Sequence, residues 1–249
     1  MIRGLYIAST GMISQKKSID VMSNNVANSQ TAGFKEDALV TTTFGDQLSY
    51  RLDAGTNPVQ IGNTNLGRDA AQIFTSFDQG AIKQTDRELD FAIEGDGFFT
   101  LQEPDGTIGL TRNGQFSVDA SGYLAGSKGS MVLGQNGPIM VGQANFNVDE
   151  IGQVYVNGNY IDTLQLTCPA DLTTLVKQEE GVFINTNPLN QSQQFNGHIV
   201  QRSLETSNVN MTKTMSDIIA SSRAFQACSQ IVKMMDQILQ KSVNEVGRL

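Results

Sequence analysis

Apolar residues recur every seven positions near both ends of the chain. This spacing keeps one apolar seam on the same side of an α-helix, which is the requirement for packing against a partner helix. Such helices at both ends indicate an assembling protein, with the repeat as its candidate subunit interface. The predicted interface residues are Leu5, Met12, Ile19 and Val26 near the start, and Met211, Met215, Ile218, Phe225, Val232, Met235, Leu239 and Val246 near the end.

The last segment gives the strongest prediction of secondary structure. No Gly or Pro lies between about Thr212 and Val246, and Asn210 is a plausible N-cap. At 1.5 Å per residue this helix would be about 50 Å long, too long to lie flat on one small domain. A helix folded back on its own β domain is the alternative. The first segment, a predicted helix from about Ile2 to Val26, offers a partner with a similar apolar stripe.

The middle of the chain has the signals of antiparallel β structure. Between Leu89 and Val200, short apolar or alternating runs are separated by dipeptides that favour positive φ, as tight hairpin turns require. These dipeptides are Asp96-Gly97, Asp105-Gly106, Asn113-Gly114, Asn136-Gly137, Asn157-Gly158 and Asn196-Gly197. One short helix is predicted from Asp171 to Gln178.

The predicted fold class is therefore α+β. Helices at the N- and C-termini form a coiled-coil layer, and a mainly antiparallel β domain lies between them in the sequence. The predicted organisation is an N-terminal helix and turn in residues 1–37, a connector with some strand content in 38–85, a central β domain in 86–205 and a C-terminal helix in 206–249.

Composition and residue inventory argue against several functions. A net charge of −8 over 249 residues, without a basic stripe, argues against nucleic-acid binding. His198 is the only histidine, so one chain cannot build a His-paired nucleophile or a multi-histidine metal site. Cys168 and Cys228 lack metal-ligand spacing and are expected to be buried thiols. We therefore expect no enzymatic activity, no cofactor and no metal.

The N-terminal segment also fails the usual test for a secretory signal. Gly4, Tyr6 and Gly11 interrupt any apolar core of a cleavable signal peptide. No run approaches the roughly 18 apolar residues of a membrane span, so membrane insertion is not expected. A protein of this kind that works outside the cytoplasm would leave by a route that reads no cleaved signal.

Three ordered motifs resemble bacterial flagellar rod and hook proteins. The stretch Leu89–Phe99, with Thr111–Phe116, is similar to the β domain of that family. The terminal motifs match best at Asn24, Asn25, Asn28, Gly33 and Phe34, and at Ser207, Asn208, Val209 and Asn210. The resemblance covers nearly the whole chain and identifies the flagellar basal-body rod family of the FlgG and FlgF type.

The resemblance implies a structural function. In this family both terminal helices form the inner coiled-coil layer of a tubular filament, a hollow drive shaft that crosses the periplasm and transmits torque from motor to hook. The implied partners are further copies, other rod and hook proteins, the bushing rings and the flagellar type III export apparatus, which needs no cleaved signal peptide. Two alternatives come from other functional classes. One is an enzyme, and the other is an extracellular module that binds a ligand through residues 86–200.

The length of the chain favours a rod protein over the longer hook proteins. The stretch from Glu205 to Asn210 and the stretch Gly97-Phe98-Phe99 favour the distal rod subunit. Gln226 stands where the distal subunit usually has Glu, and residues 212–214 lack its common acidic residues. The proximal rod subunit is therefore the alternative within the family.

Overall fold

The computed structural model describes residues 2–43, 47–51, 59–64, 67–142, 146–178, 181–187, 192–193 and 195–246. The chain forms two compact units. We call residues 1–27, 37–75 and 210–249 the helical unit, and residues 28–36 and 76–209 the β unit. Within the described residues, neither helix is long and apolar enough to cross a membrane.

The two helices lie where the sequence predicts them. Helix α1 spans Ile2–Ala27 and helix α2 spans Met211–Val246. Asn210 caps α2, because its side-chain Oδ1 accepts a hydrogen bond from the Lys213 amide at 3.1 Å, as predicted. With 36 residues, α2 is about 54 Å long.

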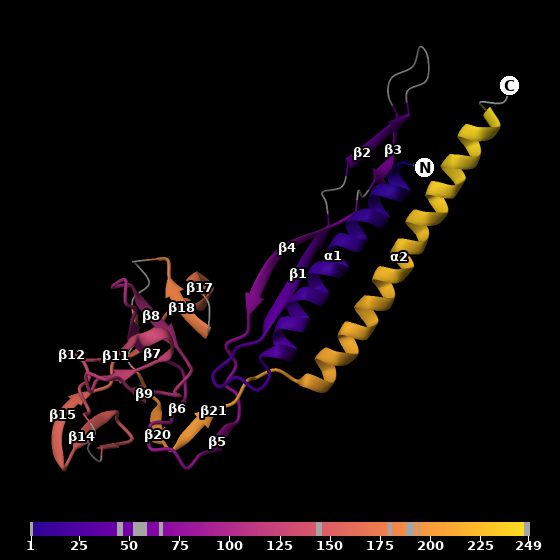
Figure 1. Cartoon of the computed structure of the whole chain (residues 1–249). Coiled ribbons are helices and arrows are strands. Elements are labelled where there is room, and N and C mark those ends of the chain that lie inside the picture. Colours follow the sequence, from indigo (N-terminus) through magenta and orange to yellow (C-terminus); the bar gives the residue numbers. More distant parts are fainter. Residues whose placement is uncertain are drawn as a thin grey trace. The chain divides into compact units, whose positions relative to one another are not determined.

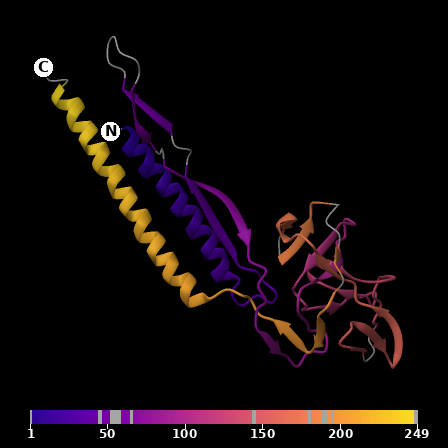
Figure 2. The ribbon, with the colours of Figure 1, turned by 180° about the vertical axis from the view of Figure 1, so that it is seen from behind.

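Helices α1 and α2 lie side by side and antiparallel (Figure 1, Figure 2). Gly4 faces the side chain of Met235, and a Cβ at Gly11 would lie 3.5 Å from the Cys228 Sγ. Seven residues forward along α1 therefore correspond to seven residues back along α2. The small residues of α1 let the larger side chains of α2 approach the α1 backbone.

A β-ribbon packs along α1 in the same unit (Figure 1). Strand β1 (Asp37–Thr43) pairs with β4 (Arg68–Thr75), and β2 (Gln47–Arg51) pairs with β3 (Val59–Thr64), both antiparallel. The segment 38–85, for which the sequence predicts a connector, thus holds these strands and β5 (Ile82–Gln84). The β-branched residues Val40 to Thr43 favour such extended structure.

The β unit is built around one large antiparallel sheet. Its strands follow the order β17-β18-β8-β7-β11-β10-β9, with β12 beside β11 and β16 between β7 and β19. Two further pairs, β6–β20 and β5–β21, and the meander β13-β14-β15 complete the described strands of this unit. The α+β class, with a helix at each end and antiparallel strands between them, is confirmed.

The strands of the β unit are short. Their bounds are β6 Phe91–Glu94, β7 Phe98–Gln102, β8 Ile108–Thr111, β9 Ser117–Val118, β10 Leu124–Ala125, β11 Met131–Gly134, β12 Gly137–Pro138, β13 Phe146–Val148, β14 Gln153–Val156, β15 Asn159–Thr163, β16 Leu166–Pro169, β17 Leu175–Lys177, β18 Val182–Asn185, β19 Ser192–Gln193, β20 His198–Gln201 and β21 Ser203–Glu205. Aliphatic side chains and phenylalanine rings form the core between them, and Phe99 meets Phe116 edge to face at a centroid distance of 5.2 Å.

Some predicted turns are confirmed. Asn157 and Gly158 have φ values of 51° and 81° and connect β14 to β15, as a tight hairpin requires. Gly106 has φ of 87° in the turn between β7 and β8, and its amide donates to the Glu103 carbonyl at 2.8 Å.

Other turn predictions are wrong, and the reason is close packing. Gly114 and Gly197 are absent from the positive-φ residues; a Cβ at Gly114 would collide with the Phe91 carbonyl, and one at Gly197 with that of Glu94. The predicted helix from Asp171 to Gln178 is also wrong. Asp171 caps a single 3-10 turn, Leu172–Thr174, and the chain continues as β17 because that segment pairs with β18.

Candidate assembly surfaces

A buried charge cluster joins the two terminal motifs inside the β unit. Lys35 and Glu205 are each 1% exposed, and the Lys35 ammonium lies 2.7 Å from Glu205 Oε1. The ammonium also donates to the Asp78 carbonyl at 2.7 Å, and the Gly80 amide donates to Glu205 Oε1 at 2.9 Å. A buried ion pair is tolerated only when further hydrogen bonds satisfy its polar atoms, and the Asp78 carbonyl and the Gly80 amide supply such bonds here.

A second cation shares the same carboxylate. Arg112 Nη1 lies 3.3 Å from Glu205 Oε2, and its Nη2 donates to the Gly95 carbonyl at 2.8 Å. Burial lowers the pKa of Lys35; hydrogen bonding and attraction from Glu205 oppose this shift, and repulsion from Arg112 adds to it. Two buried cations therefore depend on Glu205.

Three of the predicted motif residues, Gly33, Phe34 and Asn208, make specific contacts within the β unit. Gly33 has φ of 67°, and a Cβ there would collide with the Arg112 backbone. The Lys177 ammonium lies 3.8 Å from the centroid of the buried Phe34 ring, a cation–π contact. Asn208 accepts from the Glu36 amide at 2.8 Å and donates to the Ser76 carbonyl at 3.0 Å.

The remaining motif residues organise the chain at the ends of the helices. Asn25 is buried in the helical unit; its side chain donates to the Asp37 carbonyl at 2.7 Å and accepts from the Asp37 amide at 3.0 Å. In the β unit, the Thr31 amide donates to the Asn28 carbonyl at 3.1 Å, and Ser207 Oγ accepts from the Val209 amide at 3.3 Å. Asn24 is exposed on α1.

The predicted interface residues differ in exposure. The four on α1 are half-buried, and so are Ile218, Phe225, Val232, Met235 and Leu239 on α2. Met211 and Met215 are exposed, and the side chain of Val246 lies outside the described part of the chain. The contact between Met235 and Gly4 shows that part of this series faces α1 of the same chain.

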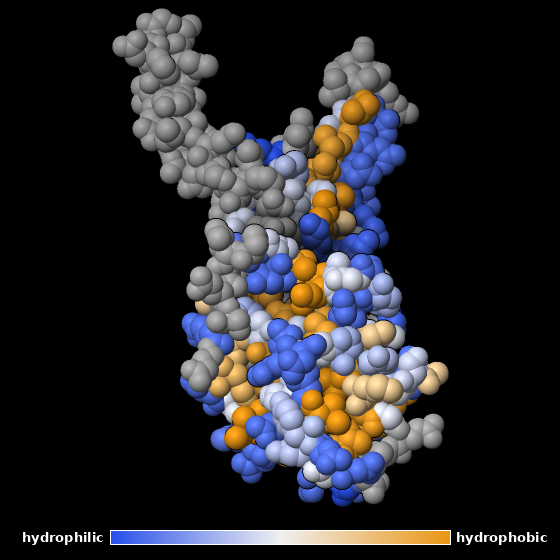
Figure 3. Space-filling model, turned by 90° about the vertical axis from the view of Figure 1, so that its left-hand side faces the viewer, coloured by the Kyte–Doolittle hydropathy of each residue, from blue (hydrophilic) through white to orange (hydrophobic). Residues whose placement is uncertain are grey.

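Sequence reasoning missed a second apolar series on α2. Its consecutive members are 4, 3, 4, 3 and 4 residues apart, a spacing that also places residues on one helix face. The search for a strict seven-residue repeat did not detect this series. Its members are Ala220, Ala224, Ala227, Ile231, Met234 and Ile238. Apolar residues reach the surface of both units between polar ones (Figure 3).

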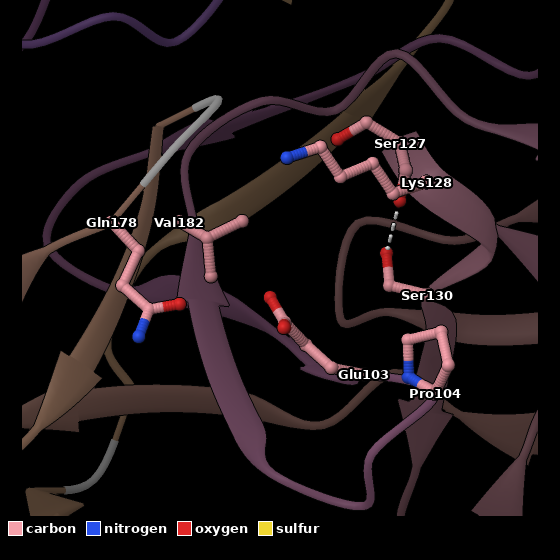
Figure 4. Close-up of a pocket in the computed structure, with 7 residues that line it drawn as sticks. All are labelled: Glu103, Pro104, Ser127, Lys128, Ser130, Gln178 and Val182. Carbon is pink, nitrogen blue, oxygen red and sulfur yellow. Dashed lines mark hydrogen bonds between the residues drawn. The ribbon is translucent and has the colours of Figure 1, made fainter.

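Two cavities lined by described residues of the β unit contain no catalytic constellation. In a cavity of about 620 Å³, the side chains of Glu103, Lys128 and Val182 point towards the middle (Figure 4). The Ser130 hydroxyl there donates to the Ser127 carbonyl at 2.8 Å. A second cavity contains His198, which is exposed on β20. Among the described residues, no group of three or more His, Cys, Asp or Glu side chains could hold a metal ion. Cys168 is a buried thiol of the β unit, as expected, whereas Cys228 in the helical unit is only half-buried.

Three family models match successive parts of the chain. Residues 5–35 match the flagella basal body rod protein model, residues 92–184 the flagellar hook protein FlgE/F/G D1 domain, and residues 200–245 the flagellar basal body rod FlgEFG protein C-terminal model. These matches include both terminal motifs and most of the β unit.

Relatives match along their full length. The flagellar basal-body rod protein FlgG of Bacillus subtilis (strain 168) is 31% identical over 98% of this chain and 99% of its own. FlgG of Buchnera aphidicola subsp. Schizaphis graminum is 33% identical over 97% of this chain and 98% of its own. The rod protein FlgF of Rhizobium meliloti (strain 1021) is 30% identical over 99% of both chains. The chain belongs to the flagellar basal-body rod protein family, whose members are structural components of the flagellum and not enzymes.

Proposed function

We propose that this chain polymerises into the hollow rod that transmits torque from the flagellar motor to the hook. The observation that carries the proposal is the apolar surface that α2 leaves exposed in a single copy. Met215, Ile219 and Met234 are 46%, 56% and 53% exposed on this helix. Covering such side chains with neighbouring copies would stabilise the filament by about 1.5 to 3 kcal/mol for each large residue fully buried.

The inner layer of this rod would contain the helical unit. In the proposed arrangement α1 and α2 form a coiled-coil layer, and the interface series from Leu5 to Val246 is covered jointly by the partner helix and by neighbouring copies. The half-buried state of Phe225, Val232 and Leu239 supports this proposal, since each keeps surface that a neighbour could cover. Long helices would spread shear over many small contacts.

Within the family we favour the distal rod position. The terminal motif from Glu205 to Asn210 supports it, while Gln226 and the lack of acidic residues at 212–214 keep the proximal position as the alternative. We further propose passage through the flagellar type III export apparatus without a cleaved signal peptide. The filament would contact rod and hook proteins, and the bushing rings where these are present.

Polymerisation can be tested with two variants and a control. Phe225→Asp places a charge in the half-buried seam, and Met215→Asp places one at an exposed apolar position. Met215→Leu, the control, keeps an apolar side chain at the same exposed position as Met215→Asp. The first two should prevent rod formation in basal bodies viewed by electron microscopy, while the control should form rods. Normal rods from Phe225→Asp and Met215→Asp would refute the interface.

The rod position can be tested by complementation. We expect the chain to restore hooks and swimming in cells that lack their distal rod subunit, but not in cells that lack the proximal one. The opposite pattern would assign the proximal position.

A further inference from the structure

The chain passes between the helical unit and the β unit four times, after residues 27, 36, 75 and 209. The first two passages enclose one short segment, residues 28–36, which leaves the helical unit after α1 and returns to it as β1. We call this segment the connecting loop. The connecting loop, residues 76–78 and residues 206–209 are therefore the places in the β unit where α1, β1, β4 and α2 are attached.

The connecting loop is held in the β unit by contacts with distant parts of the chain. The Gly33 amide donates to the Glu205 carbonyl at 2.8 Å. The Lys35 carbonyl accepts from the Lys177 ammonium at 2.9 Å, and the Lys35 side chain is buried beside Glu205. The buried charge cluster thus fixes this attachment.

The segment that leads into α2 is attached differently. Among residues 207–210, which the structure describes completely, the hydrogen bonds that reach other segments come from the Asn208 side chain. Its Oδ1 accepts from the Glu36 amide at 2.8 Å, and its Nδ2 donates to the Ser76 carbonyl at 3.0 Å and to the Asp78 carbonyl at 3.2 Å. One side chain therefore joins three of the attached segments.

Asn208 is inserted into the end of the β1–β4 ladder. Residues 36 and 76 continue the register of this ladder, and the Ser76 amide donates directly to the Glu36 carbonyl at 2.8 Å. In an antiparallel pair of this kind, the return bond runs from the amide of the first residue to the carbonyl of the second. Here the Asn208 carboxamide lies between the Glu36 amide and the Ser76 carbonyl and bonds to both.

We infer that Asn208 is a latch that ties the segment leading into α2 to the residues that flank β1 and β4. We call the state with all three Asn208 bonds the closed latch. This role rests on the proposed rod function, in which each copy must present α2 to its neighbours from a fixed starting point. Asn208 precedes the first residue of α2 by three positions, so the closed latch fixes that point.

Opening the latch leaves no backbone group without a partner. When Asn208 withdraws, the Glu36 amide and the Ser76 carbonyl can bond to each other, because the ladder register places them opposite one another. The Asp78 carbonyl keeps its bond from the Lys35 ammonium at 2.7 Å. A lost hydrogen bond is costly mainly when it leaves a buried group unsatisfied, so the open latch should cost the β unit little stability.

Loss of the latch should therefore act on the rod and not on the β unit. Asn208→Ala removes three hydrogen bonds, and the direct bond between Glu36 and Ser76 replaces one of them. A net loss of two bonds lowers the ratio of closed to open copies by about 25-fold, since one bond is worth about a factor of five. A rod needs many closed copies in succession, so electron microscopy of basal bodies from Asn208→Ala cells should show few or no rods.

Gln201→Ala is the matched control. Like Asn208, the Gln201 side chain accepts one hydrogen bond and donates two, from the Val148 amide at 3.1 Å, to the Glu88 carbonyl at 2.9 Å and to the Phe146 carbonyl at 3.5 Å. None of these partners belongs to the segments that attach the helical unit. Gln201→Ala should lower the midpoint of thermal unfolding of the full-length chain at least as much as Asn208→Ala, yet cells with Gln201→Ala should build rods.

Asn208→Asp separates hydrogen-bond donation from side-chain size. The carboxylate has the shape of the amide and can accept from the Glu36 amide, but it cannot donate to the carbonyls of Ser76 and Asp78. It should fail to build rods, as Asn208→Ala does. Normal rods from both Asn208 variants, or a larger loss of thermal stability in Asn208→Ala than in Gln201→Ala, would overturn the latch. Absence of the wild-type chain from purified basal bodies would instead refute the rod function.

Discussion

Lys35 and Glu205 form an ion pair of 2.7 Å that is almost completely buried, although 170 residues separate them in the sequence. Arg112 shares the Glu205 carboxylate, so a single anion pairs with two cations that are both almost completely buried. The buried charge cluster of the β unit therefore forms only when both terminal motifs are in place.

Loss of the anion should be costly. Glu205→Gln leaves Lys35 and Arg112 without their carboxylate, and we expect it to lower the free energy of unfolding by about 3 to 5 kcal/mol. Urea denaturation followed by tyrosine fluorescence would measure this, as the chain has five Tyr and no Trp.

The surface pair of Arg202 and Glu88 provides the control for this effect. Its side chains are 55% and 47% exposed, so Glu88→Gln should cost less than about 1 kcal/mol. Equal losses from Glu88→Gln and Glu205→Gln would contradict the importance of burial at the cluster.

The buried lysine should make stability depend on pH. Burial lowers the pKa of Lys35 in the folded chain below the 10.5 of the unfolded chain. The unfolded state thus binds more protons in the window below 10.5, and the contribution of this group to stability rises with pH there. The difference in free energy of unfolding between wild type and Lys35→Met should therefore increase from neutral pH towards 10.5. A difference that is flat or falls with pH would be inconsistent with a lowered pKa.

The sequence predicts those elements whose conformation depends on residues close by in the sequence, and it fails where a distant segment decides the conformation. The bounds of α2 follow from its uninterrupted helix formers and the Asn210 cap, and the hairpin at Asn157-Gly158 follows from the positive φ that both residues accept. Gly114 misleads because its role depends on the Phe91 carbonyl, which the turn signal cannot reveal.

The charge cluster was beyond sequence reasoning for a related physical reason. Lys35, Arg112 and Glu205 come from three distant segments, and charged residues are usually exposed, so no pattern indicates that these three are buried together. The seven-residue repeat predicts helices that pair. It does not show which apolar positions meet the helix of the same chain and which stay exposed.

Asn25 should hold the start of β1 to the end of α1. Asn25→Ala removes both hydrogen bonds to the Asp37 backbone, and we expect a loss of about 2 to 3 kcal/mol together with faster hydrogen exchange of the Asp37 amide. Ser23→Ala, at an exposed position two residues earlier on α1, should have little effect on either quantity. Unchanged exchange at Asp37 in Asn25→Ala would show that this contact does not hold the strand.

Two glycine substitutions should have opposite effects on stability. A Cβ at Gly11 would make an ordinary contact of 3.5 Å with the Cys228 Sγ, and alanine is the better helix former. Gly11→Ala should therefore stabilise the helical unit by about 0.5 to 1 kcal/mol. Gly33→Ala should destabilise the β unit by more than this gain, because φ at Gly33 is 67° and the added carbon would collide with the Arg112 backbone. Thermal unfolding of both variants measures the two signs, and destabilisation by Gly11→Ala would mean that α1 and α2 pack more tightly than this contact allows.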